Sequence, residues 1–238
     1  MSTDEAPRKF YKAVAVADHA NGFAVTLDGR TVKTPAKAAL VLPTRALAAK
    51  CAAEWDAQDK FIRAETMPLT RLCNVALDHA QHARAELAAR VVKFAETDLL
   101  SHRAEGPNAL VARQAAAWDT LLAWSADTLG ARLISGVGIL ALPQSREALA
   151  AVGRYAAGLD DFRLTGLAHA AGLATSAVIA CALAAGRLSG AEAFAAAALD
   201  DLYQLETWGE DEEARQRLNN QRTEYEALEQ FFAALEPM

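Results

Sequence analysis

The chain has few aromatic residues and few cysteines, and its second half contains no lysine. Aromatics make up 7% of the 238 residues, the three cysteines lie far apart, and the last lysine is Lys93. Few aromatics together with abundant alanine argue against a β-sandwich and favour close-packed helices. An odd number of widely spaced cysteines predicts no disulfide framework, so we expect buried thiols in a reducing compartment.

The sequence also lacks the common signatures of catalysis. No G-x-S-x-G nucleophile elbow, phosphate-binding P-loop, H-E-x-x-H or C-x-x-C motif occurs. We therefore expect no catalytic residue, no cofactor and no metal, and a protein that is not an enzyme. The alternative is a helical metal-dependent enzyme that uses His79 and His82, which lie one helical turn apart near Asp78. Two imidazoles are not a complete site, and a third ligand would have to come from elsewhere.

Charge is distributed unevenly along the chain. Residues 1–104 contain 15 Lys and Arg against 12 Asp and Glu, whereas residues 105–238 contain 9 against 18. The acidic second part would repel nucleic-acid phosphates and anionic membrane surfaces. We expect no nucleic-acid partner, and a protein partner with a basic or apolar surface instead.

The first 42 residues predict a small antiparallel β-meander. Residues 10–17 and 23–27 alternate in polarity, Asp28-Gly29 is typical of a two-residue hairpin turn, and residues 30–34 and 40–42 read as further short strands. Such a sheet is not stable alone and needs a helix on its apolar face.

Helical patterns follow the meander. A helix that opens at Pro43-Thr44 should cover the sheet, and helical spacing then continues until Gly106-Pro107 interrupts the chain. Most of the remaining sequence is helical in pattern. We predict an α+β fold, with an N-terminal α+β domain of residues 1–104 and a mainly α-helical C-terminal domain of residues 105–238.

Residues 164–186 form a run of 23 residues without a charge. The run is long enough to cross a hydrocarbon layer of roughly 30 Å. His169 and the abundance of alanine, glycine, serine and threonine make its transfer into lipid much less favourable than that of a leucine-rich span. We expect one central helix packed on every side and no stable membrane insertion. The N-terminal residues resemble neither a signal peptide nor a transit peptide, so we expect a cytoplasmic protein, or a mitochondrial matrix protein in a trimmed organellar form.

Residues 200–213 set large aromatics beside seven acids and no basic residue. One interpretation is a recognition surface. The other is structural. Tyr203 and Trp208 would anchor the core, and the acids at residues 210–213 would stabilise the last helix by interacting with the positive end of its dipole. An S-x-x-E capping box at residues 189–192 predicts a helix that buries Leu202 and Leu205 and ends at Gly209. Four consecutive acids exceed what one helix start can use, because the dipole effect fades within a turn.

A series of short motifs along most of the chain occurs in a specific order. The motifs include Arg8-Lys9-Phe10-Tyr11-Lys12, Leu27-Asp28-Gly29-Arg30, Glu54-Trp55-Asp56-Ala57-Gln58, Met67-Pro68-Leu69-Thr70, Thr97-Asp98-Leu99-Leu100, Trp118-Asp119 and Trp208-Gly209-Glu210-Asp211. In this order of motifs the chain resembles the assembly chaperones of the ATP synthase F(1) sector, which hold its free α subunit before β subunits join.

The resemblance implies an ATP-independent chaperone that binds the unassembled ATP synthase α subunit and shields its β-binding apolar surface until β joins. It implies a protein without cofactor or metal, and we expect a monomer. The family carries an important acid in its Trp-Gly-Glu motif, and this acid matches Glu210. Trp55 matches a family motif too, and we interpret it as structural. The residues expected to contact the partner are Glu210, Trp208, Asp211, Tyr203 and Glu206.

Overall fold

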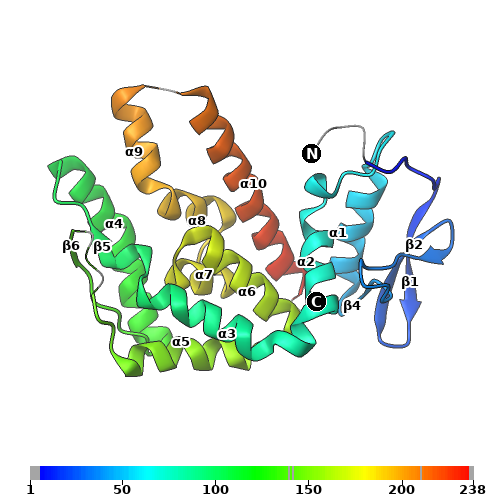
Figure 1. The fold of residues 1–238 in the computed structure, drawn as a ribbon, viewed down its shortest axis with the longest axis horizontal. Coiled ribbons are helices and arrows are strands. Elements are labelled where there is room, and N and C mark those ends of the chain that lie inside the picture. The colour runs from blue at the N-terminus through cyan, green and yellow to red at the C-terminus, as the bar shows by residue number, and fades with distance from the viewer. Residues whose placement is uncertain (1–5, 139, 141, 210, 236–238) are drawn as a thin grey trace. The chain divides into compact units, whose positions relative to one another are not determined.

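The computed structural model describes residues 6–138, 140, 142–209 and 211–235 (Figure 1). The chain forms two compact units: Met1–His82 together with Gln230–Met238, and Ala83–Glu229. An antiparallel sheet lies near the N-terminus and the remainder is mostly helical, so the predicted α+β class is confirmed. The predicted domains, residues 1–104 and 105–238, stay a prediction, and their boundary falls inside the second unit.

The sheet of the first unit is built around its second strand. The strands are β1 (Val14–His19), β2 (Gly22–Leu27), β3 (Arg30–Thr31) and β4 (Val41–Leu42). Each of β1, β3 and β4 pairs antiparallel with β2, and β3 and β4 pair with opposite ends of it. Asp28 and Gly29 both have positive φ, +48° and +78°, as the predicted hairpin turn requires.

The first strand begins at Val14 rather than at residue 10. The segment before it is held by other contacts: the amides of Lys12 and Ala13 donate to the Asp28 carboxylate, at 3.1 and 2.8 Å from Oδ1. These bonds lower the pKa of the Asp28 carboxyl. The motif at residues 8–12 and the turn motif at residues 27–30 are thereby joined in space.

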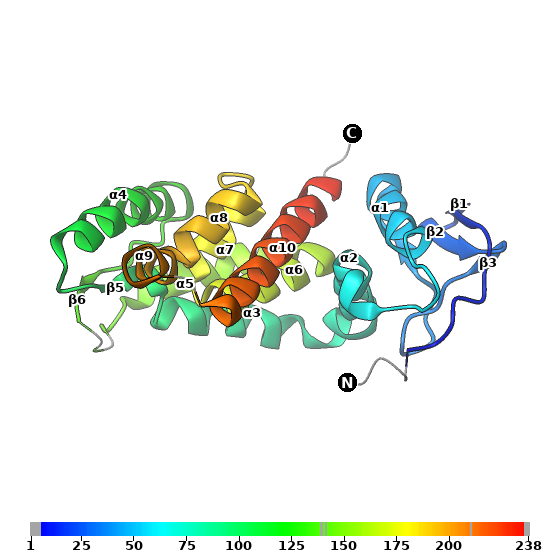
Figure 2. The ribbon, with the colours of Figure 1, turned by 90° about the horizontal axis from the view of Figure 1, so that it is seen from above.

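Helix α1 (Arg45–Asp56) covers the sheet, as predicted (Figures 1 and 2). The Thr44 hydroxyl accepts a hydrogen bond from the Leu47 amide and caps the helix start. Leu47 and Cys51 are fully buried on the face that packs against β1 and β2. A helix thus supplies the apolar cover that the small sheet needs.

Helix α2 (Pro68–Val75) is capped from a distance. The two carboxylate oxygens of Glu54 accept from the amides of Leu69 and Thr70, each at 2.8 Å, and from the Thr70 hydroxyl at 2.7 Å. Burial raises the pKa of the Glu54 carboxyl, although these hydrogen bonds oppose the rise. The motifs at residues 54–58 and 67–70 are therefore two halves of one structural contact. A π-helical turn, Ala76–Ala80, follows α2.

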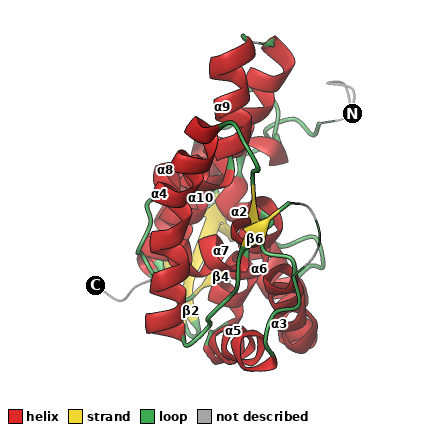
Figure 3. Ribbon diagram, turned by 90° about the vertical axis from the view of Figure 1, so that its left-hand side faces the viewer, coloured by secondary structure: helices red, strands yellow, loops and turns green. Residues whose placement is uncertain are grey.

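The described residues of the second unit form helices and two short strands. Its elements are α3 (Gln81–Glu96, which begins at the unit boundary), β5 (His102–Arg103), α4 (Asn108–Trp124), β6 (Gly136–Val137), α5 (Arg146–Gly158), α6 (Asp161–Ala174), α7 (Ala177–Ala184), α8 (Gly190–Ala197), α9 (Leu199–Trp208) and α10 (Glu212–Ala234, whose end belongs to the first unit). Strands β5 and β6 pair in parallel, and Figure 3 shows β6 as a short strand among helices.

The uncharged run at residues 164–186 forms two helices, so the expectation of one central helix was wrong. Thr175 adopts a left-handed conformation with φ 48° and ends α6, and the Ser176 hydroxyl caps α7. Every residue of α7 from Ala177 to Leu183 is buried. Within the described part of the chain, no helix is both long enough and apolar enough to cross a membrane.

Asp98 joins the end of α3 to the start of α7 inside the second unit. Its carboxylate is fully buried and accepts from the Ser176 hydroxyl at 2.7 Å and from the amides of Leu100 and Val178, each at 3.1 Å. Burial raises the pKa of the Asp98 carboxyl to about 6, because loss of water outweighs the stabilising hydrogen bonds. The acid of the motif at residues 97–100 is therefore part of the core.

Helix α8 packs closely on α10. A Cβ atom at Gly190 would lie 2.6 Å from the carbonyl oxygen of Tyr225, so only glycine permits this approach. The predicted capping box is present between Ser189 and Glu192. The helix that it starts ends at Ala197 rather than at Gly209, and α9 begins after Ala198.

Candidate partner-binding site

Of the residues that were expected to bind a partner, Tyr203, Glu206, Trp208 and Asp211 lie in α9 and at the start of α10. We call this region, residues 203–209 and 211–217, the α9–α10 tip. Every residue of α9 is at least partly exposed, including Leu202 and Leu205, which are only half-buried. The expectation that these two leucines belong to the core was wrong. Gly209 ends α9 with φ +97°, a conformation that favours glycine.

Trp208 presents a large apolar side chain to solvent. Its exposed fraction is 78%. Trp118 of the same unit has an exposed fraction of 0%, and its indole N–H donates to the carbonyl of Ala196 at 2.9 Å. The structural interpretation of Trp208 as a core anchor is therefore wrong, and its side chain is available to a partner.

Tyr203 and Glu206 face helix α4. The Arg113 guanidinium lies over the Tyr203 ring, 5.2 Å from its centroid, and Arg113 Nη1 is 2.6 Å from Glu206 Oε2. Both partners of the ion pair are at least half exposed, so the pair adds little to stability. One arginine thus orients two of the expected contact residues while it leaves the Glu206 carboxylate accessible.

Asp211 has a structural use as well as an exposed position. Its Oδ1 accepts from the Glu213 amide at 3.1 Å and its carbonyl accepts from the Arg215 amide at 2.9 Å, so it caps the start of α10. Glu212 and Glu213 occupy the first turn of α10, where their negative charges interact favourably with the positive end of the helix dipole. The structural interpretation of these acids, as stabilisers of the helix start, therefore accounts for part of their role. Glu210, the acid of the Trp-Gly-Glu motif, lies outside the described residues.

Sequence reasoning missed the arginines that accompany these acids. Arg113 precedes Glu206 by 93 positions, and Arg217 on α10 lies 3.2 Å from the Asp201 carboxylate on α9. The only sequence signal was that residues 200–213 contain no basic residue of their own, so that any counter-charge had to come from another element.

Trp55 and its neighbours are structural, as expected. The Tyr11 hydroxyl donates to the Trp55 carbonyl at 2.6 Å, and the rings of these residues meet edge to face with centroids 5.9 Å apart. The Lys9 amino group donates to the carbonyls of Asp56 and Gln58 at 3.1 and 2.7 Å. The first motif of the chain thus closes the end of α1.

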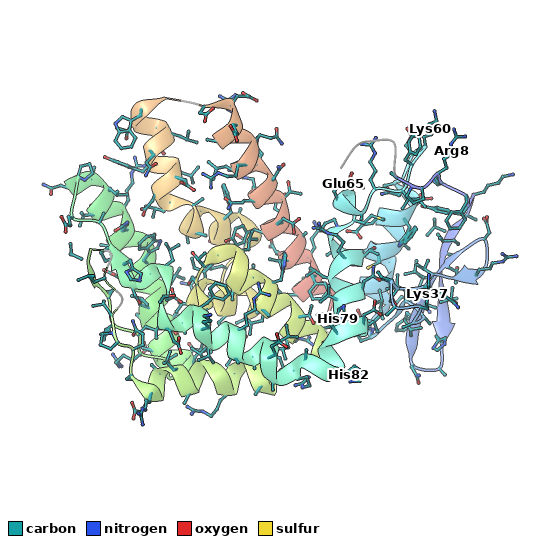
Figure 4. The ribbon with its side chains drawn as sticks, in the orientation of Figure 1. Arg8, Lys37, Lys60, Glu65, His79 and His82 are labelled. Atoms are coloured by element: carbon teal, nitrogen blue, oxygen red, sulfur yellow. The ribbon has the colours of Figure 1, made fainter. Side chains whose placement is uncertain are left out.

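The metal-site alternative has no support from its neighbouring acid. Asp78 accepts from the Thr34 hydroxyl at 2.6 Å and from the Ala36 amide at 3.1 Å, so its carboxylate already holds the loop after β3. His79 and His82 are exposed, and Glu65, the acid labelled with them in Figure 4, lies away from both. Among the residues that the structure describes, no group of three or more His, Cys, Asp and Glu side chains could hold a metal ion.

Known proteins resemble this chain over most of its length. A family model described as ATP12 chaperone protein matches residues 8–126. Protein atp12, mitochondrial, of Schizosaccharomyces pombe is 26% identical over 221 residues, which cover 88% of this chain and 76% of that protein.

Two solved structures share the fold. Atp12 from Paracoccus denitrificans is 36% identical with a TM-score of 0.89, over 97% of this chain and 99% of that one. A structure from Agrobacterium tumefaciens is 40% identical with a TM-score of 0.91, over 97% of this chain and 87% of that one. The similarity therefore extends through both units.

Proposed function

The chain belongs to the ATP12 family of chaperone proteins, and from this membership we propose that it is an ATP-independent assembly chaperone for the F(1) sector of ATP synthase. In this proposal it binds the unassembled α subunit and covers the apolar surface that later receives β. Association with β then displaces it. It acts as a monomer without a cofactor, in the cytoplasm or, in an organellar form, in the mitochondrial matrix.

The observation that carries the proposed binding site is the exposure of Trp208 within an acidic region. Tryptophan is enriched among the few residues that supply most of the binding energy at protein interfaces. Acids at the rim, here Glu206 and Asp211, would speed encounter with a basic partner surface rather than add much affinity. We place Glu210 in the same site because of its motif, and Tyr203 because of its half-exposed ring beside Arg113.

The proposed function requires an affinity for the α subunit that is high enough to cover its apolar surface and low enough to release it to β. An unassembled subunit exposes apolar surface that self-associates unless it is covered. A standard interface of roughly 1,600 Å² is enough to cover such a patch, and its affinity depends on a few anchors rather than on area. An interface centred on one exposed tryptophan can therefore hold the α subunit and still release it to β.

The direct test is co-expression with a tagged ATP synthase α subunit. We expect the protein to be retained with the tag and the α subunit to remain in the soluble fraction. If the protein is not retained and the α subunit stays insoluble, the proposed function is wrong.

The binding site is tested with a matched pair of variants. Trp208→Ala should weaken α-subunit binding by at least about tenfold, because it removes an exposed anchor. Phe10→Ala is the control, since Phe10 has a similar exposed fraction, 73%, but belongs to the first unit. Neither variant should change the melting temperature much. Equal binding by both variants would remove Trp208 from the site.

A further inference from the structure

A groove of about 780 Å³ runs along the first half of α10 in the second unit. It is lined by one face of the helix, with Glu213, Gln216, Arg217, Asn220 and Glu224, and by Leu173 of α6. Between Glu212 and Glu224, Leu218 is buried and the other residues of α10 are exposed or half-buried, so this half of the helix is largely exposed. The volume lies within the range of ligand-binding clefts. We propose that this groove holds an extended, basic segment of the client polypeptide.

The charges along the groove favour a basic occupant. Carboxylates of Asp211, Glu213 and Glu224 line it, against one guanidinium, that of Arg217. Asp201 lies 3.2 Å from that guanidinium and offsets its charge. His169 Nε2 is 3.4 Å from Glu224 and adds a positive charge only when it is protonated. The groove is therefore negative at neutral pH, and lysine or arginine side chains complement it.

The side-chain amides favour an extended backbone. Gln216, Asn220 and Gln221 each provide both a hydrogen-bond donor and an acceptor, and one bond, from Gln216 to Asn220 at 3.0 Å, uses only part of this capacity. An extended segment has unpaired backbone N–H and C=O groups that such amides can satisfy, whereas a helix has already paired its own.

This inference rests on the proposed function. It assumes that the protein binds the α subunit and adds which kind of client segment binds next to the α9–α10 tip. Asp211 both lines the groove and belongs to the α9–α10 tip, and Trp208 precedes it by three positions. A client anchored by an apolar contact at Trp208 would thus continue as a basic strand along α10.

The test is site-specific photo-crosslinking during co-expression with the tagged α subunit. The photoreactive residue p-benzoylphenylalanine replaces Gln216 in the groove, Trp208 at the tip, or Glu86 as a control. Glu86 is exposed and belongs to α3, a helix that lies apart from the first half of α10 in Figure 1. We expect crosslinks from positions 216 and 208 and none from position 86. The α-subunit peptide attached at position 216 should carry a net positive charge.

The outcomes separate the two proposals. Crosslinks from position 208 without any from position 216, or a crosslinked peptide at 216 that is neutral or acidic, overturn the groove assignment and leave the proposed function in place. An α subunit that is neither crosslinked nor retained overturns both.

A charge reversal gives an independent measurement. Glu213→Arg should weaken α-subunit binding roughly tenfold at low ionic strength, and the difference should shrink as salt is added. Glu86→Arg makes the same charge change on α3, outside the residues that line the groove, and should leave binding within about twofold. Equal weakening by the two variants would show a general charge effect and overturn the inference.

Discussion

The core around Asp98 and the α9–α10 tip use acidic residues in opposite ways. Asp98 is fully buried, and its carboxylate accepts hydrogen bonds from a hydroxyl and backbone amides. At the tip, Glu206 is more than half exposed, and Arg113, with which it forms an ion pair, is half exposed too. The same contrast separates Trp118, which is buried and hydrogen-bonded, from Trp208. Position in a motif therefore does not distinguish a residue that holds the fold from one that can meet a partner, whereas burial does.

The largest expected effect is the loss of the buried carboxylate. Asp98→Ala should lower the free energy of unfolding by about 3 to 5 kcal/mol, because it leaves the Ser176 hydroxyl and the amides of Leu100 and Val178 without this acceptor. Urea denaturation followed by circular dichroism measures the change. Asp127→Ala, which removes an exposed acid of the same unit, should change stability by less than about 0.5 kcal/mol. Similar losses of unfolding free energy in both variants would contradict the contrast between the buried and the exposed acid.

The next effect is a pH dependence of the free energy of unfolding that arises from the buried carboxyl of Asp98. Burial raises the pKa of Asp98 from 3.8 to about 6, so the folded state binds this proton more tightly than the unfolded state does. The resulting stability is complete below about pH 4 and is lost as the pH rises through about 6. The difference in free energy of unfolding between the wild type and Asp98→Asn should therefore fall by about 2.5 kcal/mol between pH 4 and pH 7. A difference that stays constant over this range would contradict the prediction.

A distant helix cap in the first unit should have a smaller effect. Glu54→Ala leaves the Leu69 and Thr70 amides without their acceptor and should lower the free energy of unfolding by about 2 kcal/mol. Glu54→Gln, which keeps one acceptor oxygen, should lose less. Denaturant titration of the three proteins checks this order, and an alanine variant as stable as the wild type would show that α2 does not depend on its cap.

The smallest effect is expected at the tip. Arg113→Ala removes the contacts to Tyr203 and Glu206 but should change the free energy of unfolding by less than about 1 kcal/mol, because the ion pair is exposed. Amide hydrogen exchange should become faster in α9 and stay unchanged in α7. A loss of several kcal/mol would place the tip among the elements that hold the fold.

Local patterns predicted the elements that local contacts determine. The Asp28-Gly29 turn, the Thr44 cap of α1 and the capping box at Ser189 all involve residues a few positions apart, and the structure contains each of them. The breaks at Thr175 and Ala198 were not predicted, because neither residue is a usual helix breaker and tertiary packing decides both.

The candidate site was predicted in its residues but not in its geometry. The density of acids near Trp208 indicated residues 200–213 as a candidate segment, yet the pattern could not tell that Trp208 is exposed while Leu202 and Leu205 are half-buried. The counter-charge from Arg113 lies 93 positions away in sequence, and the groove along α10 depends on Leu173 of another helix. Contacts of this range leave no periodic signal.

The uncharged run that becomes α6 and α7 has a consequence for biosynthesis. While the nascent chain grows, residues 164–186 are exposed before α8 and α10 exist to cover them. Their alanine, glycine, serine and threonine content, together with His169, makes transfer of the run into lipid less favourable than that of a leucine-rich span. Arg163 and Arg187 flank the run as charged gatekeepers that oppose its aggregation. A protein proposed to protect another subunit before assembly thus carries, in its own sequence, safeguards for the interval before it has folded.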